Sequence, residues 1–335
     1  MKKIILLLLF LVSNIQAADF VPVSENDCSN TDIRDHHPEL KEFFSTPRDQ
    51  ESISWCYGFV AADLLSVEVG RPVSALHMSS IFNKSVASDE AEQKKYSSLK
   101  GRSFRYAFEY GFTDKALEAA LTEGAICPEE TLPFESKIKK DATVEMIKTI
   151  ESVKVQCKDT DKVHLKEELK TVLPKNDYGD LNYNRILRII KKKDINVSLE
   201  KIASLVCKGH QIKIPPLRVV TFDKLKPTKE TTDSYLNVLN KALTLGKPVG
   251  IYFDTKYINK KSFNHQSSII GRKWENNKCH FRLRNSWGDY TGSYLPETKI
   301  DPADYSVWVT DETLDKMSDH LTYLESTSKK RLRKR

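Results

Sequence analysis

The pattern of apolar and polar positions predicts helices in the first part of the chain. Residues 56–69 (CYGFVAADLLSVEV) place apolar side chains at helical spacing, and the Gly-Arg-Pro sequence that follows ends the run. The same spacing predicts helices over residues 74–83 (SALHMSSIFN) and over residues 102–124, the second ending at a glycine. Together these segments predict a helical lobe over residues 46–134.

A lysine-rich segment follows over residues 135–215. It has few aromatic residues, and its apolar residues recur at helical spacing in MIKTIESVKV, LKEELKTVL and NRILRIIKKK. We expect an inserted helical segment between two lobes. Two roles are open for it: it gates or shapes access to a functional site, or it is an outer decoration that only adds surface.

After two consecutive prolines, at positions 215 and 216, the pattern becomes short and β-rich. RVVTF, PVGIYFD, SSIIGRKW and HFRLRNSW are partly alternating and predict strands, and DETLDKMSDHLTYLE predicts a final helix. Residues 216–325 are therefore expected to form a β-rich lobe with a terminal helix. Helices first and strands later predict an α+β fold.

The two ends of the chain differ from the lobes. Residues 1–17 (MKKIILLLLFLVSNIQA) combine two lysines, a short apolar run and small residues, which predicts a secretory signal peptide cleaved after Ala17. An exported protein, periplasmic or extracellular, is expected. The apolar run is short for a bilayer and no later segment predicts a membrane span. Residues 18–45 form a polar lead-in, and residues 326–335 a basic, disordered tail.

The charge of the chain is concentrated at these ends. The formal net charge is +7, but the tail sequence KKRLRKR and the two lysines of the signal account for it, so the body is nearly neutral. No basic stripe is interleaved with aromatic residues, and nucleic acid is therefore not expected as a partner. With 39% hydrophobic residues the chain can bury a sizeable core.

Six cysteines occur in this exported chain, and that compartment permits disulfides. They are Cys28, Cys56, Cys127, Cys157, Cys207 and Cys279. Cys157 and Cys207 share the lysine-rich region and are the first pair we expect. If Cys56 is a working thiol, an odd number remains, which implies a further free thiol or an intermolecular bridge. No cysteine pair has zinc-ligand spacing with a histidine nearby, so neither a metal nor a cofactor is predicted.

Cys56 stands at the first turn of a predicted helix, which suits a nucleophile. A cysteine thiol has a pKa of about 8.5, and a helix N-terminus or a protonated imidazole lowers it. Among the eight histidines, His265 differs because it begins a predicted strand, and Asn285 lies in the motif RNSWGDY at the end of the next strand. An asparagine oxygen can hold one ring nitrogen of a catalytic histidine, and Trp287 can exclude water from that bond. Each of these residues, taken alone, has an ordinary structural explanation as part of the core or of a turn. Their occurrence together favours nucleophilic catalysis.

These motifs resemble those of the papain-like cysteine peptidases. Gln50 in the DQ dipeptide, Cys56-Tyr57 and Phe59 match the nucleophile motif of that family; NHQSSIIG is similar to its histidine strand and NSWG to its asparagine motif. VSALH and GAICPEETLPF match two further family segments. The resemblance covers roughly residues 46–134 and 245–310, and implies a helical lobe facing a β-barrel-like lobe with the substrate between them.

The resemblance also implies roles for these residues. Cys56 attacks the carbonyl carbon, His265 transfers the proton, and Asn285 orients His265. The Gln50 side chain and the Cys56 backbone N–H form the oxyanion hole. The implied protein is a secreted, monomeric cysteine peptidase that acts on a peptide or protein substrate through a thioester. Two alternatives stay open: a cysteine-dependent amidase or transpeptidase on cell-wall peptides, and an inactive papain fold that serves as a binding module.

Two departures from the family pattern carry expectations of their own. Trp55 replaces a small residue beside the nucleophile and is expected to reshape a substrate subsite, and Ile53 stands where the family has a disulfide cysteine. Residues 18–49 are also too few for a folded helical prodomain. We therefore expect that no N-terminal trimming is needed and that the insert controls access to Cys56.

Overall fold

The computed structural model of the chain describes residues 20–97, 110–134, 141–156, 162–173, 181–224 and 234–327. The expected signal peptide and all but the first two residues of the basic tail lie outside these described residues, and so does Cys157. All four candidate site residues lie within them.

The first part of the chain is helical, as the spacing predicts. Its longer elements are α3 (Cys56–Val69), α4 (Ala75–Ala87), α5 (Glu90–Ser97) and α6 (Thr113–Glu123), followed by the short strand β2 (Ala125–Ile126). Gly70 and Gly124 end α3 and α6 with φ angles of 67° and 72°. These left-handed conformations suit glycine, which has no Cβ to clash.

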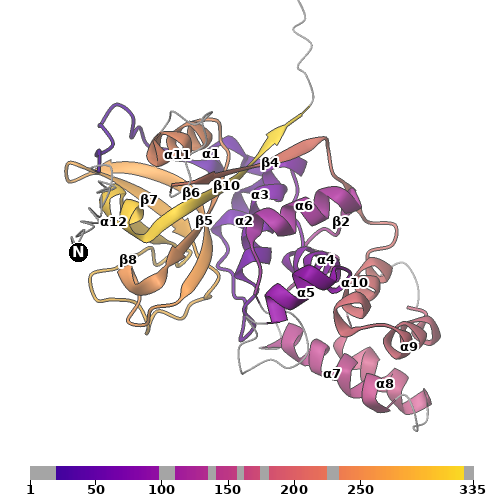
Figure 1. Cartoon of the computed structure of the whole chain (residues 1–335). Coiled ribbons are helices and arrows are strands. Elements are labelled where there is room, and N and C mark those ends of the chain that lie inside the picture. Colours follow the sequence, from indigo (N-terminus) through magenta and orange to yellow (C-terminus); the bar gives the residue numbers. More distant parts are fainter. Residues whose placement is uncertain are drawn as a thin grey trace, which may run out of the picture.

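Helix α3 is the centre of the helical lobe. Every residue from Tyr57 to Ser66 is buried, so the helix has no solvent face over that length. Figure 1 shows α3 between the sheet and the helices α4 and α6. Gly58 permits its close approach to α4, since a Cβ at that position would lie 2.0 Å from Ser79 Oγ.

The lysine-rich segment is helical as well. It contains α7 (Ala142–Gln156), α8 (Lys162–Val172), α9 (Tyr183–Lys192), α10 (Ile195–Val206) and the strand β3 (Ile212–Lys213). Its apolar residues share one core with α3 and α4. In Figure 1, α8 and α9 lie at the end of the molecule farthest from the sheet.

One disulfide expectation is wrong. Cys207 is bonded to Cys127, which precedes the lysine-rich segment in the chain, and not to Cys157. The reason is tertiary: antiparallel pairing of β2 with β3 brings the end of α10 back to the start of the segment. The bond therefore ties the segment to the helical lobe.

The last part of the chain forms an antiparallel sheet with a core of its own. Its strands are β4 (Leu217–Asp223), β5 (Val249–Asp254), β6 (Asn264–Glu275), β7 (Lys278–Arg284), β8 (Lys299–Ile300), β9 (Val307–Thr310) and β10 (Ser318–Ser326). The order along the sheet is β4-β10-β5-β6-β7-β9-β8. Two helices pack on it, α11 (Tyr235–Thr244) and α12 (Asp311–Met317), and η2 (Thr255–Tyr257) follows β5. The α+β class is confirmed.

The expected terminal helix is shorter than its sequence pattern suggests. Helix α12 ends at Met317, and the chain continues directly as strand β10. Strand β10 pairs on one edge with β4 and on the other with β5. Backbone hydrogen bonds on both edges of the strand override a local preference for helix.

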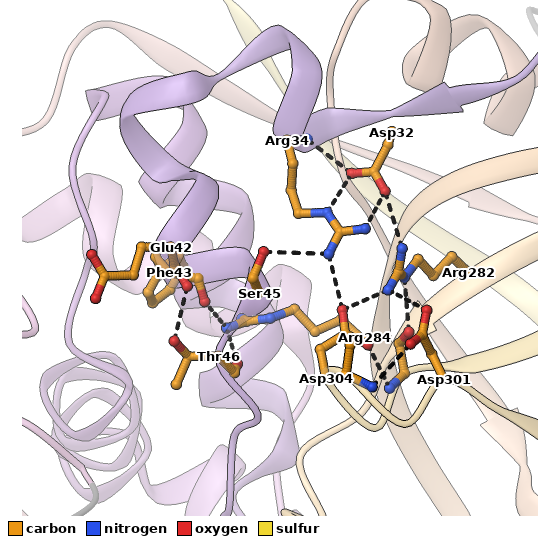
Figure 2. Close-up of polar contacts among 12 residues, drawn as sticks. Asp32, Arg34, Glu42, Phe43, Ser45, Thr46, Arg282, Arg284, Asp301 and Asp304 are labelled. Atoms are coloured by element: carbon orange, nitrogen blue, oxygen red, sulfur yellow. Dashed lines mark hydrogen bonds and ion pairs between the residues drawn. The ribbon is translucent and has the colours of Figure 1, made fainter.

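The lead-in segment is built into the β-rich lobe. It contains β1 (Thr31–Asp32), α1 (Ile33–His36), η1 (Pro38–Leu40) and α2 (Lys41–Ser45). Strand β1 pairs with β6, and a disulfide joins Cys28 to Cys279 on β7. Arg34 lies 3.1 Å from the Asp304 carboxylate, and Arg282 of β7 lies 2.7 Å from it. Figure 2 shows these two contacts. These contacts fix the lead-in to the sheet.

Candidate active site

Cys56 is the first residue of α3 and is half-buried. Its neighbour Trp55 is fully buried, with its ring centroid 6.1 Å from that of Phe134. The expectation that Trp55 reshapes a substrate subsite is therefore wrong: its indole fills the core of the helical lobe. Ile53 is fully buried too.

His265 and Asn285 lie together, at the start of β6 and just after the end of β7. Strands β6 and β7 pair antiparallel, so the start of β6 and the end of β7 lie at the same end of the sheet. His265 Nε2 lies 2.7 Å from Asn285 Oδ1. That oxygen also accepts the Ser286 N–H at 2.8 Å, which fixes the orientation of the amide. His265 Nε2 must therefore carry the hydrogen, and Nδ1 is a free base in the neutral ring.

Aromatic rings enclose this histidine–asparagine pair. The Trp287 ring centroid lies 4.7 Å from that of His265, and the Tyr294 ring lies 5.3 Å from Trp287. Asn285 Nδ2 donates to the Tyr294 hydroxyl oxygen at 2.7 Å. Burial raises the pKa of Tyr294 to about 12, so the phenol stays neutral. The role expected of Trp287 fits this geometry, whereas Tyr294 lies beyond the family motifs and was not foreseen.

Gln50 connects the loop before Cys56 to the loop after Asn285. Its Oε1 accepts the Ser286 hydroxyl at 2.7 Å, and its Nε2 donates to the Ile53 carbonyl at 2.9 Å. Its backbone N–H donates to the Ser286 carbonyl at 2.9 Å. These bonds fix the side-chain amide and use one of its two N–H groups, so one donor is left for a ligand. Ser286 was not singled out in the sequence, although it stands between Asn285 and Trp287.

The thiol and the imidazole are both held neutral by their surroundings. Burial raises the pKa of Cys56 to about 11, although the backbone amides of Gln266, Tyr57 and Cys56 itself act in the opposite direction. Burial lowers the pKa of His265 to about 4, against the bond from Asn285. The amides of the helix start do favour the thiolate, as expected, but desolvation is the larger effect. The Gln266 amide also places the thiol beside the strand residue that follows His265.

A buried ion cluster joins the two lobes behind the site. Asp63 of α3 contacts Arg284 of β7 and lies 3.3 Å from Arg48, and it accepts the Ser268 hydroxyl at 2.9 Å. Asp63, Arg48 and Arg284 are each at most 6% exposed. Arg284 directly precedes Asn285, and Arg48 lies two residues before Gln50. The cluster therefore positions both loops against α3.

A cysteine at the start of a central buried helix contacts the strand near whose start the histidine lies, and this histidine is hydrogen-bonded to an asparagine that follows the next strand. This is the arrangement that the resemblance of the sequence motifs to papain-like cysteine peptidases implies. Solved structures similar to it are titled a recombinant stem bromelain precursor (10% identity, 93% of this chain and 76% of that chain, TM-score 0.42) and a digestive procathepsin L 3 of Tenebrio molitor larval midgut (13%, 92% and 74%, TM-score 0.43). A third is a structure of the bromelain protease from Ananas comosus in complex with the E64 inhibitor (10%, 89% and 99%, TM-score 0.42). No protein-family model and no curated protein matches the chain.

Among the residues that the structure describes, no group of three or more His, Cys, Asp or Glu side chains is placed to hold a metal ion.

Proposed function

We propose that the chain is an exported cysteine peptidase that hydrolyses peptide bonds through Cys56, His265, Asn285 and Gln50. The observation that carries this proposal is the His265–Asn285 pair, which leaves Nδ1 of the histidine as a base, together with the contact of the next residue's amide, that of Gln266, with the thiol at a helix N-terminus. A structural cysteine gains nothing from such a neighbour, whereas a nucleophile needs one.

In the first half of the reaction, the Cys56 thiol gives its proton to His265 Nδ1 as its sulfur bonds to the carbonyl carbon. Asn285 holds His265 in the tautomer that can accept this proton and stabilises the imidazolium. His265 then donates the proton to the leaving amine. The carbon–nitrogen bond breaks, and a thioester with Cys56 remains.

In the second half, His265 takes a proton from water, and the resulting hydroxide oxygen attacks the thioester. The carbon–sulfur bond breaks, the carboxylic acid leaves, and the proton returns to the sulfur. In both halves the carbonyl oxygen becomes an anion. The free N–H of Gln50 and the backbone N–H of Cys56 are the donors that stabilise it, and one such donor is worth about a hundredfold or more in rate.

The compartment proposed for this reaction is outside the cytoplasm. Two disulfides, Cys28–Cys279 and Cys127–Cys207, are consistent with an extracellular or periplasmic protein. Within the described part of the chain, no helix has the length and the apolar character needed to cross a membrane.

A substrate comparison separates peptidase activity from the cell-wall alternative. We expect the purified protein to clear a protein-substrate gel and not a peptidoglycan gel, and mild reductant to increase clearing because the thiol must be reduced. Clearing of peptidoglycan alone would favour the amidase or transpeptidase reading. Clearing of neither gel by reduced protein would favour the binding module.

The pH dependence follows from the two perturbed groups. Burial lowers the pKa of His265 to about 4, so the ring becomes doubly protonated and useless as a base only below that pH. Burial raises the pKa of Cys56 to about 11, so the thiol proton that His265 must accept is still present at mildly alkaline pH. We expect kcat/KM to be flat across neutrality with an acid limb near pH 4. An acid limb at about pH 6 to 7, where free imidazole titrates, would contradict this electrostatic description.

A further inference from the structure

A cleft of about 710 Å³ opens beside the candidate catalytic groups. Two aromatic residues, Phe263 and Trp287, line this cleft. Their ring centroids lie 6.3 and 4.7 Å, respectively, from that of His265. Tyr290, which is 64% exposed, lies on the same rim. The cleft is therefore continuous with the histidine side of the site.

Its position identifies the half of a substrate that it can hold. If the proposed function is right, the leaving amine must lie within hydrogen-bond reach of His265, because this residue donates its proton. A peptide chain continuing from that amine runs past Trp287 and Phe263 into the cleft. The cleft therefore faces the residues that follow the scissile bond.

The charges in the cleft are divided between the two lobes. Asp49 and Glu51, on the loop before Cys56, and Asp141, just before α7, come from the helical side; Lys260 and Lys261 come from the β-rich side, as does Asp289. Lys260 Nζ donates to the Gly292 carbonyl at 3.1 Å. Lys260 is thus fixed on the β-rich side of the cleft.

The carboxylates of Asp141 and Asp49 are close enough to Glu51 to disfavour its charge. Burial, followed by the carboxylates of Asp141 and Asp49, raises the pKa of Glu51 to about 7, against bonds from the backbone amides of Val144 and Ala142. A positive group that enters beside them relieves this repulsion.

We propose that this cleft binds the leaving-group side of a peptide substrate and selects a lysine or arginine side chain there. The aromatic rings hold the aliphatic stem, and the acids on the helical side pair with the charged end. Asp141 belongs to the lysine-rich segment, and Glu51 accepts the Val144 N–H of α7 at 3.4 Å. The insert is therefore a part of the substrate-binding site and not only an outer decoration.

The test is a cleavage-site profile of a mixed peptide library, read by mass spectrometry. We expect Lys and Arg to exceed Glu about fivefold at one of the two positions after the cut, as a partly buried ion pair supports. Asp141→Asn should lower this preference, and Asp141→Asn combined with Glu51→Gln should lower it further, towards equal cleavage of the Lys and Glu peptides. Glu297→Gln, an exposed acid that does not line the cleft, is the matched control and should change nothing.

A binding measurement makes the outcome independent of turnover. Cys56→Ala protein should bind a dye-labelled Ala-Gly peptide with one Lys about fivefold more tightly than the same peptide with Glu. Cleavage without a basic preference would overturn this inference and leave the proposed function standing. Absence of all cleavage would overturn the proposed function; equal binding of the Lys and Glu peptides would then overturn basic recognition as well.

Discussion

Cys56→Ala is expected to reduce peptide hydrolysis by at least about a thousandfold, because the sulfur forms the covalent bond to the substrate. The side chain is half-buried and small, so its loss should leave the melting temperature nearly unchanged. Hydrolysis rates and thermal unfolding of purified wild-type and variant protein are the measurements. Full activity in the variant would overturn the assignment of the nucleophile.

The partners of Cys56 should show a graded effect. His265→Ala removes the base and should be nearly as damaging as Cys56→Ala, since residues that act as a unit are not additive. Asn285→Ala should be milder, because Trp287 still packs on the His265 ring. Gln50→Ala should lower kcat more than it raises KM, since its contact is made mainly in the transition state.

Asp63→Ala is expected to destabilise the fold by about 3–5 kcal/mol, the usual cost of leaving a buried charge without its partner. Asp63 faces two arginines that come from different lobes, Arg48 and Arg284, and both are buried. The truncation removes the carboxylate that both guanidinium groups share, and Glu129, 3.5 Å from Arg48, remains as an acid beside one of them. The free energy of unfolding from denaturant titration measures the loss.

Two variants serve as controls for this stability effect. Asp63→Asn keeps the shape and the bond to the Ser268 hydroxyl, so it should isolate the loss of charge and cost less than alanine. Glu297→Ala removes an exposed acid and should stay within about 0.5 kcal/mol of wild type. An Asp63→Ala protein as stable as the Glu297→Ala protein would show that the cluster does not hold the lobes together.

The sequence predicted those features of the fold that depend on local pattern. Apolar spacing and the glycine stops gave helices that end at Gly70 and Gly124, as observed. Alternation gave the strands that carry His265 and end before Asn285. These features depend on a 3.6- or two-residue repeat and on backbone conformations special to glycine, and both are readable from one chain.

The features that the sequence did not predict depend on contacts between distant residues. Cys207 bonds Cys127 because β2 meets β3, and β10 is a strand because it has a partner on each edge. Trp55 lies beside the nucleophile in sequence, yet its side chain is fully buried and packs against Phe134. None of these contacts has a local sequence signal.

The same limit applies to the candidate site. Sequence motifs predict four site residues, Gln50, Cys56, His265 and Asn285. In the structure His265 lies against Asn285, and Gln50 is bonded to Ser286, which follows Asn285. The Tyr294 hydroxyl and the acids of the adjacent cleft were not named, because a tyrosine and scattered carboxylates are common on any surface. Only their positions in the fold distinguish them: Tyr294 contacts Asn285, and the acids line the same cleft as Trp287.

Labelling with an epoxide that alkylates active-site thiols tests the central claim most directly. Protein beginning at Ala18 should gain one adduct at Cys56, mapped by peptide mass spectrometry, without any removal of the lead-in, which Cys28–Cys279 ties to the sheet. His265→Ala should slow this labelling strongly, while Cys157→Ser should leave it unchanged. An adduct elsewhere, or labelling at Cys56 that does not depend on His265, would contradict a catalytic thiol–imidazole pair.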